Sequence, residues 1–180
     1  SGKQHFVGRD PLHGFGAQLA RDIHGENYHP IFPWSKGPLT ARNPWPGVNQ
    51  AAPGTTLEIE VDDEVEEAAL AYLREPARQE QPWVLNASFI APHFPLIVPQ
   101  EYWNLSPLDA IDLPNIPPGH LKKLHPVYRR MRRMFGMIDF PEDQTRRARA
   151  GYYGLISYLD DKIGRLIQAL EETDQRENTI

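Results

Sequence analysis

The chain has 180 residues, of which 40% are hydrophobic and 10% aromatic, so its composition is that of a folded domain rather than a disordered segment. Its formal net charge of −5 at pH 7 argues against a polyanionic partner, and the absence of cysteine excludes disulfides, thiolate catalysis and cysteine-ligated zinc. No apolar run approaches the roughly 20 residues that span a bilayer, so no membrane partner is expected.

The first part of the chain has few regular patterns. Residues 3–7 read as the end of a strand. The segment from 24 to 56 is rich in proline, glycine, asparagine and aromatic residues. A loop of that length inside a compact domain is usually functional or an excursion over the surface.

A helix and a strand are predicted next. Asp62 and Asp63 offer an N-cap for a helix that runs to about Arg74, before Pro76 stops it. Residues 82–90 are mostly apolar and are predicted to form an interior, buried strand. A helix followed by a buried strand is one unit of an α/β fold.

A basic cluster follows, holding nine of the 19 basic residues. No groove-reading or aromatic-interleaved motif accompanies it, so we interpret it as a solvated helix face and expect no nucleic-acid partner. Its members are Lys122, Lys123, Arg129, Arg130, Arg132, Arg133, Arg146, Arg147 and Arg149.

The clearest element is a long helix predicted over residues 142–172. It starts at Pro141, with acids in its first turn, and apolar side chains then recur at spacings of three and four, which predicts one long face packed on a sheet. Another strand is expected to begin at residues 178–180. The apolar stripe consists of Tyr152, Leu155, Ile156, Leu159, Ile163, Leu166, Ile167 and Leu170.

Three side chains are candidates for chemistry. Lys3 and His5 lie two residues apart, which places both on one face of a strand, where they suit an anionic oxygen. His93 lies between Pro92 and Pro95, which restrict the local backbone and pre-aim the imidazole at the carboxyl end of the predicted strand. The alternatives are an exposed lysine, a hydrogen-bonded histidine and a histidine that fills a rigid turn.

A metal site is the weaker interpretation of another histidine pair. His24 and His29 have Asp22 and Glu26 nearby, but their spacing fits no zinc pattern. We therefore predict no metal ligands in this chain.

Three segments together resemble the sulfatase family of the alkaline-phosphatase-like superfamily. Gly2–Phe6 is similar to the family's Gly-Lys-x-His segment, and Pro92–Pro95 to its Pro-His-x-Pro segment after a strand. Arg149–Gly164 is similar to its long helix, which Glu177–Thr179 follows. The order and approximate spacing agree along nearly the whole chain.

Two further segments resemble the choline-sulfatase-like branch of that family. These are Asp10–Phe15 and Asp62–Val65. The branch usually has an acid after the Pro-His histidine, where this chain has Phe94, so the expected substrate is limited to a small-molecule sulfate ester.

The resemblance implies a fold and a place for the chain within it. The fold is an α/β sandwich with a mixed, mostly parallel sheet flanked by helices. Residues 1–180 are expected to form the central part of a sulfatase catalytic domain, incomplete at both ends. The resemblance leaves homo-oligomer formation open, and the compartment open between cytoplasm and periplasm.

The resemblance also implies site roles. Lys3 matches the lysine that bridges a formylglycine and the sulfate, His5 the histidine that helps break down the sulfated hemiacetal, and His93 the histidine that binds sulfate near the leaving oxygen. The formylglycine is expected from outside this chain, because no Cys/Ser-x-Pro/Ala-x-Arg motif occurs in it. The calcium ligands are likewise expected outside it, because the family's upstream Asp-Asp and downstream Asp-His-Gly segments are missing.

Three predictions and two alternatives follow. Lys3, His5 and His93 should converge on one pocket, the full-length enzyme should hydrolyse a sulfate ester, and this chain alone should be inactive. The alternatives are a phosphodiester or phosphonate monoester hydrolase of the same superfamily and a non-catalytic sulfatase-like scaffold domain.

Overall fold

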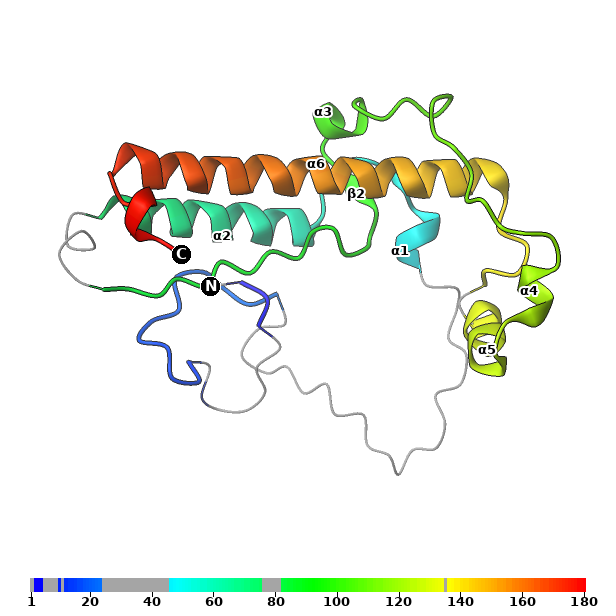
Figure 1. The fold of residues 1–180 in the computed structure, drawn as a ribbon, viewed down its shortest axis with the longest axis horizontal. Coiled ribbons are helices and arrows are strands. Elements are labelled where there is room, and N and C mark those ends of the chain that lie inside the picture. The colour runs from blue at the N-terminus through cyan, green and yellow to red at the C-terminus, as the bar shows by residue number, and fades with distance from the viewer. Residues whose placement is uncertain (1, 5–9, 11, 24–45, 76–81, 135) are drawn as a thin grey trace. The chain divides into compact units, whose positions relative to one another are not determined.

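The computed structural model describes residues 2–4, 10, 12–23, 46–75, 82–134 and 136–180 (Figure 1). The chain divides into two compact units: residues 1–32, 55–93 and 156–180 form the first, and residues 33–54 and 94–155 the second. The described elements are α1 (Pro46–Asn49), β1 (Ala52–Pro53), α2 (Leu57–Arg74), β2 (Ile97–Val98), α3 (Gln100–Trp103), α4 (His120–Lys123), α5 (Pro126–Met134), α6 (Glu142–Glu172) and the 3-10 helix η3 (Arg176–Asn178).

Helix α2 begins earlier than predicted. Thr56 is its N-cap and accepts a hydrogen bond from the Ile59 N–H at 3.4 Å, so the prediction that Asp62 and Asp63 cap the helix is wrong. Asp62 is instead fully buried in the middle of the helix, where its carboxylate accepts hydrogen bonds from another segment. The predicted end at Arg74 is confirmed.

The core of the first unit forms between α2 and the chain that leads to Ile90. Val61 and Val65 on α2 are completely buried and pack with Ile90, which is 5% exposed. A side chain between α6 and η3 closes the other end of α2: Gln175 donates to the Leu73 carbonyl at 2.8 Å and accepts from the Trp83 indole at 3.0 Å.

The predicted interior strand at 82–90 is wrong. Burial alternates over residues 82–87, with Val84 82% exposed, but not over 88–90. Among the described residues the segment pairs with another strand-like segment only at Ser88, through an isolated parallel bridge to Gly2. An interior strand needs a backbone neighbour on both sides, and within the described residues this segment has one such neighbour. Likewise, residues 178–180 begin no strand, because Asn178 ends η3.

The second unit contains a two-stranded parallel sheet. Ala52 pairs with Ile97, and Pro53 with Val98. Helices accompany this sheet, so the predicted α/β class with a parallel sheet and flanking helices is confirmed.

The N-terminal half of α6 packs very closely on the chain around β2. A Cβ atom placed on Gly151 would lie 3.1 Å from the Leu96 Cβ and would collide with the Leu96 carbonyl. One placed on Gly154 would lie 2.9 Å from the Val98 side chain and 3.2 Å from the Tyr102 carbonyl. The helix is unbroken at both glycines, as predicted. Their missing side chains are what allows this close contact.

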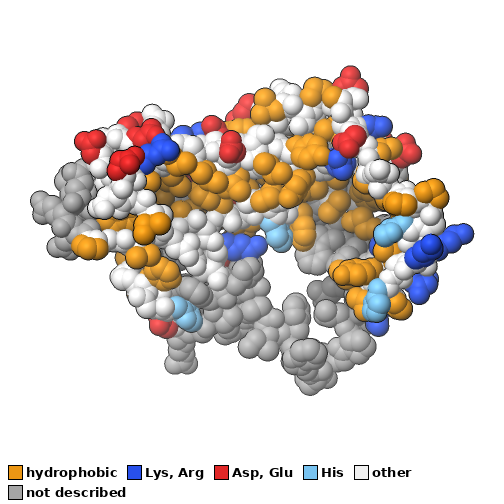
Figure 2. Space-filling model, viewed as in Figure 1, with side chains coloured by type: hydrophobic (Ala, Val, Ile, Leu, Met, Phe, Trp, Pro, Cys, Tyr) orange, Lys and Arg blue, Asp and Glu red, His pale blue; other side chains and the backbone are white. Residues whose placement is uncertain are grey.

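The predicted apolar face of α6 is only partly buried. Leu155 is buried, but Tyr152, Ile156, Ile163 and Ile167 are between 39% and 43% exposed. Hydrophobic side chains are visible along the helix in Figure 2. The fully or nearly buried positions instead include Ala150, Tyr158, Lys162 and Ala169. None of the helices in the described ranges combines the length and apolar character needed to span a bilayer.

The predicted basic cluster divides into two kinds of residue. Arg129, Arg130 and Arg133 on α5 are exposed, as expected for a solvated face. Arg149 on α6 instead pairs with Asp112 at 2.6 Å, and Arg146 donates to the Ile111 carbonyl. These α6 arginines therefore tie the helix to the preceding loop.

We predict that Gly151→Ala destabilises the complete protein by about 1–3 kcal/mol, because the added methyl group must displace backbone atoms of Leu96. Gly164→Ala is the matched control, since no atom lies within 4 Å of its added Cβ among the described residues. Alanine is the better helix former, so the control should gain about 1 kcal/mol. Urea-denaturation midpoints measure both, and equal effects would contradict the close approach.

Candidate functional site

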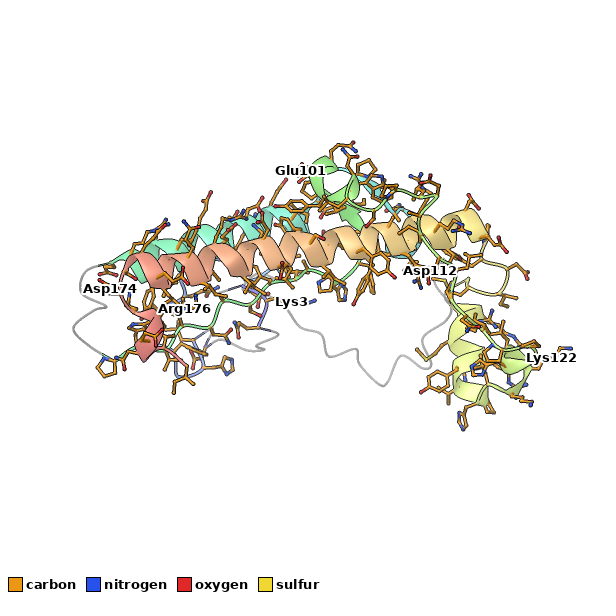
Figure 3. The ribbon with its side chains drawn as sticks, turned by 45° about the horizontal axis from the view of Figure 1, so that its top comes forward. Lys3, Glu101, Asp112, Lys122, Asp174 and Arg176 are labelled. Atoms are coloured by element: carbon orange, nitrogen blue, oxygen red, sulfur yellow. The ribbon has the colours of Figure 1, made fainter. Side chains whose placement is uncertain are left out.

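The segment that carries Lys3 is fixed against Ser88. The Lys3 N–H donates to the Ser88 carbonyl at 3.1 Å, and the Ser88 hydroxyl donates back to the Lys3 carbonyl at 2.5 Å. Lys3 itself is half-buried (Figure 3). Both polar groups of the Lys3 backbone are thus held by a single residue of the 82–90 segment.

Glycine is required at position 2 for two reasons. Gly2 has φ +84°, a region that residues with a Cβ rarely adopt. A Cβ there would also lie 2.8 Å from the Val65 side chain and would collide with the Ser88 carbonyl. The glycine of the Gly-Lys-x-His segment therefore lets the chain lie directly on α2 and Ser88, which sets the position of Lys3.

His93 lies in a short turn at the end of the same extended segment. Its N–H donates to the Ile90 carbonyl at 2.9 Å, and its side chain is exposed. The N–H groups of Ile90 and Ala91 donate to the two carboxylate oxygens of Asp62, at 2.6 and 2.9 Å. The backbone that leads into His93 is therefore bonded to α2.

The structure brings two of the three predicted site residues onto neighbouring backbone. Lys3 is bonded to Ser88, which lies five residues before His93 in the same unit. His5 lies outside the described residues. The convergence of the three side chains on one pocket stays a prediction.

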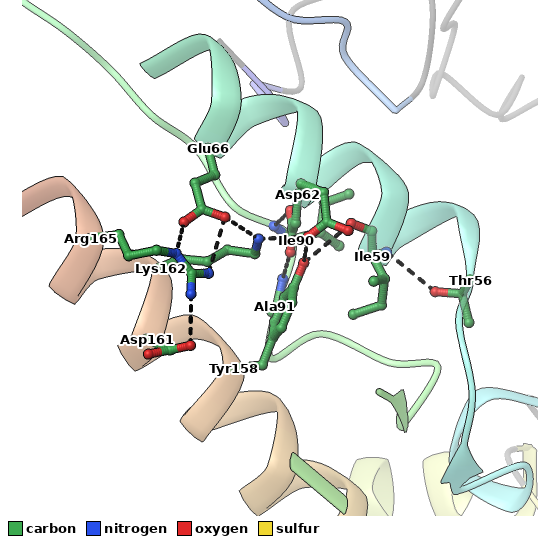
Figure 4. Close-up of polar contacts among 11 residues, drawn as sticks. Thr56, Ile59, Asp62, Glu66, Ile90, Ala91, Tyr158, Asp161, Lys162 and Arg165 are labelled. Atoms are coloured by element: carbon green, nitrogen blue, oxygen red, sulfur yellow. Dashed lines mark hydrogen bonds and ion pairs between the residues drawn. The ribbon is translucent and has the colours of Figure 1, made fainter. Parts of the chain in front are cut away.

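A buried polar cluster lies between α2 and α6, and it was not predicted from the sequence. Lys162 is 1% exposed, and its Nζ lies 2.6 Å from both the Asp63 and the Glu66 carboxylates. Figure 4 shows the contacts of this cluster. We call it the α2–α6 polar cluster; its members are Asp62, Asp63, Glu66, Tyr158, Lys162 and Arg165.

The charges of this cluster are compensated to different degrees. Burial raises the pKa of Asp62, although the N–H groups of Ala91 and Ile90 and the charge of Lys162 act in the opposite direction. Burial also acts to raise the pKa of Glu66, but hydrogen bonds from Arg165 and Lys162 outweigh it, and the pKa is lowered. Burial and a hydrogen bond donated to Asp63 raise the pKa of Tyr158.

Sequence patterns alone could not identify this cluster. The acids Asp62, Asp63 and Glu66 lie close together in sequence, and such a group usually indicates the solvated start of a helix. The available signal was a lysine and an arginine on the predicted apolar helix at positions 162 and 165, where a strictly apolar stripe would be expected.

The described residues provide no site for a metal ion. Nowhere in the described ranges do three or more His, Asp or Glu side chains form a group that could hold one. Asp22, one of the weaker metal candidates, accepts a hydrogen bond from the Gln4 N–H at 2.9 Å. His24, His29 and Glu26 lie outside the described residues. The described residues therefore give no fit to calcium.

Comparison with known proteins gives one consistent result. The family model described as Sulfatase matches residues 21–180. The chain is 32% identical to the choline-sulfatase of Rhizobium meliloti (strain 1021) over its whole length, covering 37% of that protein, and 27% identical to the iduronate 2-sulfatase of Homo sapiens over 85% of the chain, covering 31% of that protein. It is 33% identical to an arylsulfatase of Clostridium perfringens (strain 13 / Type A) over 59% of the chain and 21% of that protein. The chain thus spans about a third of the length of the first two relatives.

The polar cluster predicts a pH-dependent stability difference. Glu66→Gln should destabilise the complete protein at pH 7 by about 3 kcal/mol, because it leaves Lys162 buried with one carboxylate fewer. The folded-state pKa of Glu66 is lowered, so its stabilisation is present above its ordinary pKa of 4.5 and is lost as pH falls through the folded value.

The difference between wild type and Glu66→Gln should therefore shrink as pH falls below 4.5. The opposite titration of Asp62 is common to both proteins and largely cancels in this difference. Urea denaturation across pH 3–7 provides the measurement. A difference that grows toward acidic pH would contradict the assigned direction.

Proposed function

Because the chain belongs to the sulfatase family, we propose that it forms the central part of a sulfatase catalytic domain and binds the sulfate oxygens of a small-molecule sulfate ester. The complete protein hydrolyses that ester. The observation that carries the proposal is the pair of hydrogen bonds between the Lys3 backbone and Ser88. They place a cationic residue beside the segment that ends at His93. Both belong to motifs that resemble those of the family.

The three site residues act as cationic or polar donors in this proposal. Transfer of SO₃ spreads negative charge over the sulfate oxygens, and preorganised donors stabilise that charge more than mobile water does. Lys3 contacts an oxygen on the side of the nucleophile, His93 contacts the leaving oxygen, and His5 assists the breakdown of the sulfated intermediate. The held backbone of Lys3 and of His93 supplies the preorganisation.

The nucleophile and the metal are proposed to come from residues outside this chain. A formylglycine would supply the nucleophile and calcium would supply positive charge, both held by residues outside this chain. The residues of this chain bind and orient the ester, and they supply the cationic and polar donors Lys3, His5 and His93.

The substrate is proposed only as a small-molecule sulfate ester. The relatives named above act, by their names, on choline sulfate, iduronate 2-sulfate and aryl sulfates. The position after His93 is Phe94, which gives the site no acid there to pair with a quaternary ammonium. No particular alcohol is therefore assigned.

We predict that this 180-residue chain releases no nitrophenol from 4-nitrophenyl sulfate, with or without added calcium, whereas the complete reading frame does. Groups that act as one catalytic unit are strongly non-additive, so losing the nucleophile costs nearly as much as losing the whole site. The same assay with 4-nitrophenyl phosphonate monoesters distinguishes the related hydrolases. A complete protein inactive on both would indicate a scaffold domain.

We predict that Lys3→Ala and His93→Ala each lower the kcat/KM of the complete protein by about 10²–10³-fold, as removal of one oxyanion donor does in other enzymes. Lys122→Ala is the control, because Lys122 is an exposed cation on α4. Steady-state hydrolysis of 4-nitrophenyl sulfate measures all three. Unchanged kcat/KM in both site variants would remove these residues from the site.

A further inference from the structure

We propose that Asp62 is a positioning residue for His93: it holds the backbone from Ile90 to His93 so that the imidazole is aimed at the substrate. The inference rests on the proposed function, in which His93 contacts the leaving oxygen. Asp62 and the turn from Ile90 to His93 belong to the same compact unit.

Every backbone N–H group from Ile90 to His93 has a hydrogen-bond acceptor. Those of Ile90 and Ala91 donate to the two oxygens of the Asp62 carboxylate, at 2.6 and 2.9 Å (Figure 4). Pro92 has no N–H, and the His93 N–H closes the turn on the Ile90 carbonyl at 2.9 Å. Asp62 therefore satisfies both donors that the turn does not satisfy itself.

A carboxylate at this buried position is costly. Asp62 is 0% exposed, and burial raises its pKa, so ionising it there is expensive. A well-packed apolar side chain would stabilise an α2 position at least as well. A carboxylate adds a fixed two-oxygen acceptor that sets the position of two successive peptide groups, and the residue placed by those groups is His93.

Asp62 is held on a rigid element. It is the sixth residue of the 18-residue helix α2, next to the fully buried Val61, and belongs to the α2–α6 polar cluster. Lys162 is held by Asp63 and Glu66, and its charge also favours the ionised form of Asp62. The acceptor that positions the His93 turn is thus carried by α2, and the charge of Lys162 connects it to α6.

A double-mutant cycle in the complete protein separates positioning from general stabilisation. Asp62→Asn keeps the shape of the side chain but presents an NH₂ group to one of the two N–H donors. It should lower kcat/KM by about 10–100-fold, the range expected when a reacting group is displaced by about 1 Å. On the His93→Ala background the same substitution should cost less than about threefold, because the group it positions is already absent.

A change of substrate gives an independent signature. If Asp62 acts through His93 at the leaving oxygen, Asp62→Asn and His93→Ala should both lose more activity on phenyl sulfate than on 4-nitrophenyl sulfate, because phenolate is the poorer leaving group. Asp63→Asn is the matched control: Asp63 is the neighbouring acid on α2 but bonds to Lys162 and Tyr158 rather than to the His93 turn.

The outcomes are distinguishable. If His93→Ala itself leaves kcat/KM unchanged, the proposed role of His93 fails, and the positioning inference fails with it. If His93→Ala is impaired but Asp62→Asn costs the same factor on both backgrounds, or Asp63→Asn reproduces it, only the positioning inference is overturned. Should Asp62→Asn not fold, Asp62→Ser, whose hydroxyl accepts one N–H without a buried charge, is used in the same cycle with the same criteria.

Discussion

The hydrogen bonds from the Ile90 and Ala91 backbone to the buried Asp62 carboxylate are the interaction on which the first unit depends. They bond the extended segment before His93 to α2, and Lys162 then connects the same stretch of α2 to α6 through Asp63 and Glu66. The acidic face of α2, which would ordinarily be solvated, is thereby buried at Asp62 and Glu66. Its charges are tolerable there because hydrogen bonds and opposite charges surround them.

In the proposed site, the N-terminal segment makes close backbone contact with the segment before His93 and with α2. Gly2 lies directly on Ser88 and Val65 because it has no side chain, and Lys3 is then bonded to Ser88 through both of its backbone polar groups. Two cationic or polar donors that are ninety residues apart in sequence thus lie on adjacent segments. Donors fixed in this way suit a reaction in which charge develops on sulfate oxygens.

Glycine has a second use in α6 of this protein. Gly151 and Gly154 let the helix approach the backbone around β2 in the second unit, whereas Gly164 lies in open space among the described residues. The same residue type inside one helix therefore has opposite consequences for stability. Which one applies depends on the neighbour across the contact and not on helix propensity.

The sequence by itself determined the elements whose signals are local: the full extent of α6, the end of α2 at Arg74, and the two motifs around Lys3 and His93 that resemble the sulfatase family. Only the tertiary structure decided where α2 begins, how residues 82–90 pair, and which face of α6 is buried. Asp62 shows the physical reason, because a helix-capping acid and a buried acceptor look alike in sequence. Its partners lie 28 and 29 residues away, and no local pattern reports a contact at that separation.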